Sequence, residues 1–250
     1  MTLMETYYNN ITHYLQEIMK TESERIYQAA SIIADYIKED KIFFVYGPGG
    51  HSNLATQEVF FRAGGLMHVS AILDEGTLLS SGALRSMAIE RTSGYGKIVI
   101  DDYNLQEDDL LIIINAYGIN TATIDAALES KKRNLKTISV SSHQHARNTP
   151  NEHPARHPSK KNLHDLTDVS IDSKVKVGDA VISIEGQEQK VGAISTFTNA
   201  FILNCICNEA INILAAQDIQ PPIWKSGNAS GGDEWNSQFI NRFKGRIKNL

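Results

Sequence analysis

The sequence lacks the features that mark disulfide-linked, secreted and membrane-spanning proteins. Cysteine occurs only at Cys205 and Cys207, and two residues with this spacing lie about 200° apart around a helix, which makes them poor disulfide partners. The amino terminus has neither the basic start nor the apolar core of a signal peptide. No apolar run reaches the roughly 18 to 20 residues that span a bilayer. We therefore expect a cytoplasmic protein with no membrane partner.

The chain also has no strong excess of charge. Its formal net charge is −5, with 24 basic and 29 acidic residues interleaved along the sequence, which argues against a nucleic-acid-binding surface. Apolar residues make up 42% of the sequence and charged residues 21%, as in packed globular proteins. A chain of 250 residues can form one large α/β domain or two small ones. We find no internal repeat.

Several catalytic and binding motifs are absent as well. The dinucleotide fingerprint G-x-G-x-x-G, the G-K-[ST] of a P-loop, and the zinc patterns HExxH and CxxC do not occur. Five of the eight histidines lie in the segment 142–166, which also holds three prolines, but their spacing does not match a metal site. We expect no metal and no cofactor, and we expect this segment to be a long loop.

What is present is a strand, a glycine-rich turn and a helix, in the segment Lys41–Gly65. Ile42–Tyr46 are apolar on both faces, as in a buried parallel strand. The glycines that follow leave no side chains over the turn. Ser52 is placed to cap a helix, and Gly64 is placed to end it. Because backbone N–H groups at a helix amino terminus bind anions, the segment predicts a phosphate site.

The rest of the chain alternates between predicted strands and helices. Residues 1–38 carry two apolar stripes, and the capping-box spacing of Thr21 and Glu24 predicts a break between two helices. The further predicted strands are Met67–Leu73, Lys97–Asp101, Asp109–Ala116, Thr137–Ser141, Val169–Ile171 and Val181–Ile184. The further predicted helices are Ala83–Thr92, residues 121–134, Val191–Ala216 and a carboxyl-terminal piece. This alternation predicts an α/β fold with a mainly parallel sheet and helices on both faces.

Two loops at predicted strand ends carry short hydrogen-bonding side chains, Gly47–Ser52 and Asn115–Thr121. Loops at the carboxyl ends of parallel strands meet at one edge of the sheet, where ligands bind. Neither loop contains lysine or arginine, so a phosphate would be held by backbone N–H groups, hydroxyls and amides. The alternative is that both loops are ordinary strand-to-helix turns.

Three segments carry a family resemblance: FFVYGPGGHS, LLIIINAYGINTATIDAALESKKRNLKTISVSS and ARHPSKKNLHDLTDVSID. In this order they resemble the sugar isomerase (SIS) domain family, and most of all a bacterial branch similar to phosphoheptose isomerases. The resemblance implies a three-layer α/β/α, flavodoxin-like fold that dimerises and binds phosphosugars at the carboxyl edge of the sheet. It implies a single SIS domain over residues 1–250, with helices at 1–38, an α/β core at 39–216 and an extension at 217–250.

The resemblance also assigns ligand contacts to the two loops. The family's first loop is commonly G-x-G-x-S, and here one more residue separates the glycines from the serine. The second loop, often S-x-S-G-x-T, has both serines replaced and its threonine one position late. The implied phosphosugar-binding residues are Gly49, Gly50, Ser52, Asn115, Tyr117, Gly118, Asn120 and Thr121. Residues 156–160 (RHPSK) are expected to reach over the sugar or across a subunit boundary.

Isomerisation of an aldose phosphate to a ketose phosphate needs a base for the proton between C1 and C2, and an acid that helps to open the ring. Glu58, on the helix that leaves the glycine loop, is the predicted base, and His51 can contact phosphate or the ring oxygen. Glu90 and Glu209 are second choices. Two other functions remain open: an etherase that acts on a phosphorylated amino sugar, and a phosphosugar sensor without catalysis.

Overall fold

A five-stranded parallel β-sheet forms the centre of the computed structural model, which describes all 250 residues. The strands are β1 (Phe43–Tyr46), β2 (Val69–Ile72), β3 (Leu110–Ile114), β4 (Lys136–Ser141) and β5 (Val169–Asp172). Their order is β2-β1-β3-β4-β5, and Val45 of β1 lies opposite Ala71 on one side and Ile112 on the other. The order reverses between β1 and β3, so the loops after these two strands diverge and leave a crevice where ligands bind in such sheets.

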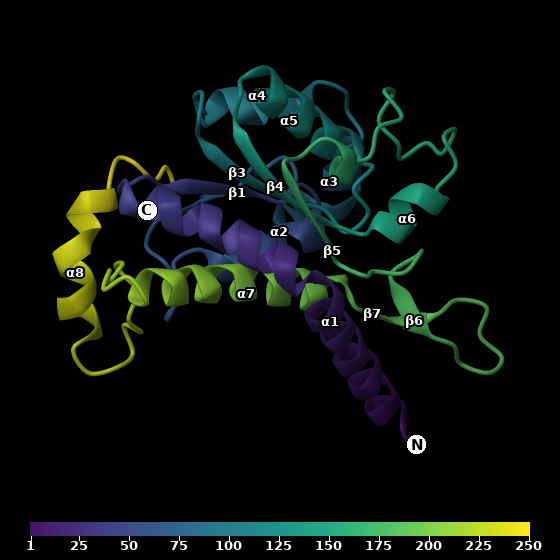
Figure 1. Cartoon of the computed structure of the whole chain (residues 1–250). Coiled ribbons are helices and arrows are strands. Elements are labelled where there is room, and N and C mark those ends of the chain that lie inside the picture. The colour runs from purple at the N-terminus through teal and green to yellow at the C-terminus, as the bar shows by residue number, and fades with distance from the viewer.

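Helices cover both faces of the sheet (Figure 1). One face carries α1 (Leu3–Lys38), α2 (Gly50–Val59) and α7 (Ser195–Ala215), and the other carries α4 (Tyr95–Asp102) and α5 (Thr121–Lys132). Alternate residues of each strand point to opposite faces, so Phe43 and Val45 pack in the first layer and Phe44 and Tyr46 in the second. The predicted three-layer α/β/α fold is confirmed.

Two predicted elements were wrong. Residues 1–38 form one helix, α1, and not two. Thr21 does not cap a second helix, because its hydroxyl donates to the carbonyl of Glu17 within the same helix. Lys97–Asp101, predicted as a strand, lies inside the helix α4. Val99 and Ile100 pack in the core beside α5, which overrides their preference for strands.

Several predicted boundaries also differ. Helix α2 begins at Gly50 with Gly49 as its N-cap, so Ser52 lies in the first turn, and the helix ends at Val59 well before Gly64. The segment 142–166 contains the helix α6 (His143–Asn148) and a 3₁₀ turn at Leu163–Asp165. The remaining helix before α4 is α3 (Ala83–Glu90), which follows a 3₁₀ turn at Leu79–Ser81.

A two-stranded antiparallel hairpin projects beside the amino-terminal half of α1 (Figure 1). It pairs β6 (Ala180–Ile182) with β7 (Val191–Ala193), so Val191, predicted to be helical, lies in a strand and α7 begins at Ser195. The Tyr7 hydroxyl donates to the carbonyl of Ala193 at 2.6 Å, which ties the hairpin to α1.

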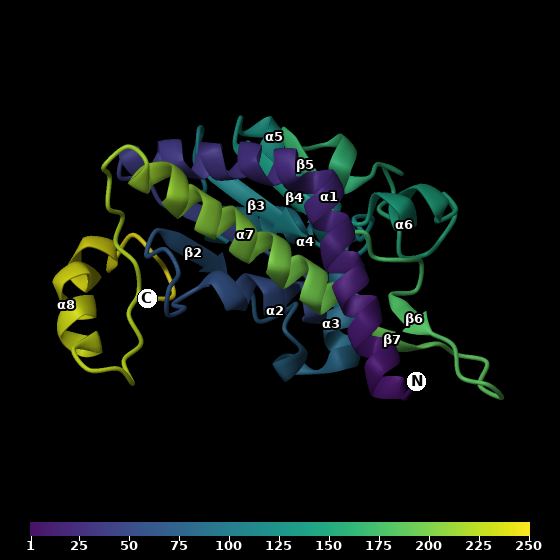
Figure 2. The ribbon, with the colours of Figure 1, turned by 60° about the horizontal axis from the view of Figure 1, so that its bottom comes forward.

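Helix α7 lies between α1 and α2 in the layer that covers this face of the sheet (Figure 2). By length and composition alone its 21 residues could cross a membrane. The core helices of soluble proteins share this length and composition, and α7 packs against α1 and α2.

The carboxyl-terminal extension docks near the start of β2. Trp224 and Phe243, the latter at the end of α8 (Gly232–Phe243), form a small apolar cluster with Met67. The backbone N–H of Gly64 donates to the carbonyl of Trp224 at 2.8 Å, and Arg242 donates to the carboxylate of Asp40 at 2.7 Å. The extension lies at the opposite end of the sheet from the loops after β1 and β3 (Figure 1).

Candidate functional site

A cavity of about 500 Å³ lies at the carboxyl edge of the sheet, over the point where the strand order reverses. It is lined by the glycine loop after β1, the loop after β3, residues of α6 and the segment that follows it, the turn before β6 and the first residue of α7. Its polar lining comprises His51, Ser52, Glu90, Arg91, Asn115, Tyr117, Asn120, His145, Asn148, Thr149, His153, Asp179 and Ser195.

The glycine loop brings its backbone against a carboxyl group. Gly49 has φ +91°, a conformation that L side chains rarely adopt, and a Cβ built there would lie 2.8 Å from Oε1 of Glu90. Gly49 is the N-cap of α2, and Asn120 is the N-cap of α5. Neither makes a side-chain cap hydrogen bond, so the free N–H groups of both first turns remain available at this edge of the sheet.

Asn115 connects the two loops. Its Oδ1 accepts the backbone N–H of Tyr117 at 3.2 Å and of Gly118 at 2.8 Å, and this shapes the second loop. Its Nδ2 donates to the carbonyl of Pro48 and to Oε1 of Glu90, each at 3.3 Å. The family's serine could not bridge these groups, because its side chain carries a single hydroxyl.

Glu90 ends α3 and is the one carboxyl group at the centre of these contacts. Burial raises its pKa from the ordinary value of 4.5 to about 7, and the hydrogen bond from Asn115 offsets only part of this effect. Near neutral pH Glu90 is therefore divided between its acid and its base form, as a group that both removes and returns a proton requires.

An aromatic pair forms the facing wall. The rings of Tyr117 and His145 stack with centroids 4.0 Å apart. Burial raises the pKa of the Tyr117 hydroxyl, and the carboxylates of Asp179 and Glu90 raise it further. Burial lowers the pKa of His145 to about 4, so its imidazole is neutral at pH 7. The wall therefore offers flat, uncharged surface rather than positive charge.

The segment 142–166 is held inward by its own side chains. The buried guanidinium of Arg156 donates to the carbonyl of Thr149 at 2.9 Å and to that of Ala146, so it closes the end of α6. Nε2 of His157 lies 3.0 Å from the carboxylate of Asp125 in α5. The expectation that these residues reach over a sugar is wrong for Arg156 and His157, which fix the cavity wall instead.

Most of the predicted contact residues meet in this cavity, and three predicted residues do not. Gly49, Gly50, His51, Ser52, Asn115, Tyr117 and Asn120 line it. Gly118 shapes the second loop, and Thr121 is buried at the start of α5. Glu58 points elsewhere: it pairs with Arg62 at 3.3 Å and lines a different hollow beside α7. Glu58 lies six residues beyond Ser52, and the turn of α2 directs its side chain away from the loops.

The sequence indicated only weakly some of the residues that line the cavity. Glu90 was a second choice, because a carboxylate at the end of a short helix carries no motif. His145 follows β4 and lies at the same edge as the two loops, so the strand-end rule could have found it. Arg91 and Asp179 reach the cavity only through the fold. No group of three or more metal-ligating side chains comes together in the structure.

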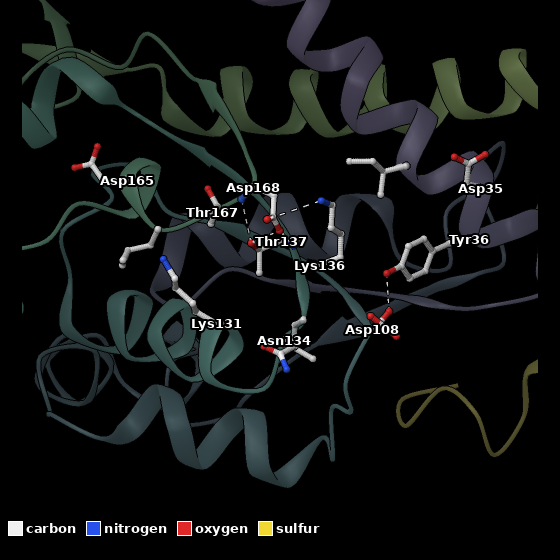
Figure 3. Close-up of a pocket in the computed structure, with 13 residues that line it drawn as sticks. Asp35, Tyr36, Asp108, Lys131, Asn134, Lys136, Thr137, Asp165, Thr167 and Asp168 are labelled. Carbon is white, nitrogen blue, oxygen red and sulfur yellow. Dashed lines mark hydrogen bonds and ion pairs between the residues drawn. The ribbon is translucent and has the colours of Figure 1, made fainter.

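A second cavity, of about 540 Å³, lies between α1 and the amino ends of β4 and β5 (Figure 3). Four carboxylates line it, and Lys136 is paired with Asp168 at 3.8 Å. Burial and the neighbouring carboxylates raise the pKa of Tyr36 there to about 12. A negative field at the amino ends of the strands does not suit an anion, so the first cavity is the candidate site.

The SIS-domain family model matches residues 6–142. The chain therefore belongs to the SIS-domain family, as its sequence resemblance indicated. It is 36% identical over 251 residues to a UPF0309 protein of Caldanaerobacter subterraneus, a match that covers 99% of this chain and 100% of that protein. It is also 36% identical over 245 residues to a UPF0309 protein of Halalkalibacterium halodurans, covering 98% of this chain and 96% of the relative.

Two solved structures share the fold. A phosphoheptose isomerase from Neisseria gonorrhoeae is 13% identical with a TM-score of 0.54, and the match covers 84% of this chain and all of that one. A phosphoheptose isomerase from Francisella tularensis is 17% identical with a TM-score of 0.51, and the match covers 85% of this chain and all of that one. At these identities the likeness concerns the fold alone.

Proposed function

We propose that this protein binds a sugar phosphate in the cavity between the β1 and β3 loops and interconverts its aldose and ketose forms. The observation that carries the proposal is the placement of Glu90, whose pKa of about 7 suits proton transfer, directly against the glycine loop. Membership of the SIS-domain family and the names of the two phosphoheptose isomerases of the same fold support the ligand class.

The phosphate would bind at the amino termini of α2 and α5. Both first turns offer unpaired N–H groups, and their dipoles favour negative charge. The hydroxyl of Ser52, the ring of His51 and the amide of Asn120 line the same end of the cavity. Asn120 is 7% exposed, and its Oδ1 has no hydrogen-bond partner. A buried amide without a partner is costly unless a ligand or water satisfies it, which supports a polar ligand here.

Glu90 would then act as the base. With the phosphate fixed at the helix termini, C1 and C2 of the sugar are held at a constant distance from the carboxylate, which supplies the orientation that proton transfer needs. The carboxylate removes the proton from C2 and returns it to C1, while a proton moves from the C2 hydroxyl to the C1 carbonyl oxygen, so that the enediol formed between the two steps becomes the ketose. His51, next to the loop, would contact the ring oxygen or the phosphate.

A thermal-shift screen tests the ligand class. Sugar phosphates should raise the unfolding temperature, because a ligand that binds only the folded state stabilises it by RT ln(1 + [L]/Kd). The matching free sugars should have little effect at the same concentration, since they lack the group that the helix termini bind. Equal shifts with sugar and sugar phosphate would contradict a phosphate site.

The exposed face of α7 supports the prediction of a homodimer. This 21-residue helix has a single charged residue, Glu209, yet only 44% of its most apolar window is buried. Apolar hollows flank it where Met19 of α1 meets Phe201 and Cys205. Interface cores are depleted in charge in this way, and a second copy could cover the face by two-fold symmetry.

Light scattering at micromolar concentration should therefore give twice the chain mass. Met19→Glu places a charge in the apolar face and should shift the protein to monomer while leaving it folded. Ile98→Glu, on α4 across the sheet, is the matched control, because Ile98 is similarly exposed and should leave the dimer intact. A wild-type monomer at that concentration contradicts the prediction.

A further inference from the structure

A third helix amino terminus, that of α7, reaches the cavity, and the carboxylate of Asp179 occupies this terminus. Ser195, the first residue of α7, lines the cavity together with the glycine loop. Oδ1 of Asp179 accepts the backbone N–H of Ile194 at 3.0 Å and of Ser195 at 2.8 Å. Oδ2 accepts the hydroxyl of Ser195 at 2.6 Å. Asp179 thus occupies the position where an anion would bind to α7.

This arrangement makes the three helix amino termini at the cavity electrically different. The amino termini of α2 and α5 have no side-chain cap and stay open to an anion. The amino terminus of α7 does not, because Asp179 already supplies its negative charge. The carboxyl groups of Asp179 and Glu90 both raise the pKa of the Tyr117 hydroxyl, which lines the same cavity. The neutral stack of Tyr117 and His145 brings no positive charge to the cavity.

We propose that Asp179 is a specificity-determining residue, which restricts the cavity to ligands with a single anionic group. The inference rests on the proposed binding of a sugar phosphate. A ligand whose phosphate lies at α2 and α5 shares the cavity with Asp179, which lines it beside Ser195. A hydroxyl or an ammonium group there can donate to the carboxylate, which accepts only three of about four possible hydrogen bonds. A carboxylate or second phosphate there would be repelled.

The best alternative explanation is that Asp179 only caps α7. A cap needs an acceptor at this position but not a negative charge, and serine or asparagine serves as well. The cap therefore needs the oxygen acceptors of Asp179 but not its charge. Asp179 also lines the cavity, where that charge can act on a ligand. An experiment that removes the charge and keeps the acceptor therefore separates the two roles.

Matched pairs of ligands test the proposal. Sorbitol 6-phosphate and ribitol 5-phosphate differ from 6-phosphogluconate and 5-phosphoribonate only at the end far from the phosphate, where a hydroxymethyl group replaces the carboxylate, and all four are open-chain. Dissociation constants for all four are measured by calorimetry with the wild type, Asp179→Asn and Glu185→Gln. Asp179→Asn keeps an oxygen acceptor for the N–H groups of α7. Glu185→Gln removes the same charge from the exposed hairpin loop, outside the cavity.

The wild type should bind the monophosphates at least tenfold more tightly than the corresponding acids. Asp179→Asn should reduce this ratio to about two by gaining affinity for the acids, with the monophosphates nearly unchanged. Glu185→Gln should keep the wild-type ratio. The unfolding temperature of each variant without ligand is measured alongside, so that a folding defect in Asp179→Asn is seen directly.

The proposal is overturned if the wild type binds acids and monophosphates equally. It is also overturned if Asp179→Asn weakens both classes by the same factor, as a purely structural cap would. When neither monophosphate binds the wild type, the proposed function fails and this inference fails with it. When both monophosphates bind and the acids bind equally well, only this inference fails.

Discussion

Glu90→Gln should abolish the exchange of deuterium from D₂O into a bound sugar phosphate while leaving the binding of that ligand nearly intact. Glutamine keeps the shape of the side chain and its contact with Asn115 but cannot remove a proton. General base catalysis contributes about 10² to 10⁴ in rate, so the loss should be plain by NMR. In the wild type, exchange should rise with pH and level off above about 7, where Glu90 is ionised.

Glu58→Gln is the matched control, because Glu58 pairs with Arg62 outside the cavity. Its exchange rate should equal that of the wild type. Exchange that persists in Glu90→Gln would remove Glu90 from the mechanism. A wild type that binds sugar phosphates but exchanges no proton would favour the sensor over both the isomerase and the etherase, since both reactions begin with proton abstraction.

The same substitution should change how stability depends on pH. The folded pKa of Glu90 is raised from 4.5 to about 7, so the folded protein holds this proton more tightly than the unfolded chain does. The stabilising contribution of this group is fully present below pH 4.5 and is lost as the pH rises through 7. At about 1.36 kcal/mol per pKa unit, the free energy of unfolding falls by about 3 kcal/mol over this range. Urea unfolding at pH 5 and 8 should show this loss in the wild type and not in Glu90→Gln.

Gly49→Ala should destabilise the protein by about 2 to 3 kcal/mol and weaken sugar phosphate binding by more than tenfold. Two effects combine: a φ of +91° is strained for alanine, and its Cβ would lie 2.8 Å from the Glu90 carboxylate. The loop must therefore move away from Glu90, and the N–H groups of α2 move with it. Denaturant unfolding and calorimetry measure the two losses.

Gly64→Ala separates backbone strain from the contact with Glu90. Gly64 has a similar φ of +83°, but a Cβ there meets nothing within 4 Å, and Gly64 lies outside the cavity. Its substitution should cost about 1 kcal/mol and leave ligand affinity unchanged. Equal effects of the two substitutions on ligand affinity would show that the glycine loop does not shape the binding site.

The pattern of apolar residues in the sequence determined most of the fold. Strands β1 and β3 are apolar on both faces, so their burial in a parallel sheet follows from composition alone. The mistakes arose where two local signals competed. Thr21 and Glu24 have the spacing of a helix start, but α1 passes through them without a break, because the stripe on either side packs on the same layer.

The two loops of the candidate site were also readable from the sequence. A glycine run and a loop that holds Asn115, Gly118 and Asn120 each follow an apolar strand, and the rule that parallel strands end at one edge places them together. The strand order then brings β1 and β3 side by side. Seven of the predicted residues line the cavity for this reason.

What the sequence by itself determined is therefore the fold class and the anion-binding edge, because both depend on local pattern and strand ends. Only the tertiary structure decided which carboxylates reach that edge. The direction of a helical side chain changes by about 100° with each residue, so a shift in where α2 begins turns Glu58 away. Glu90 and Asp179 line the same cavity although they are nearly ninety residues apart in the sequence, and their distance from the loops depends on packing that no local pattern records.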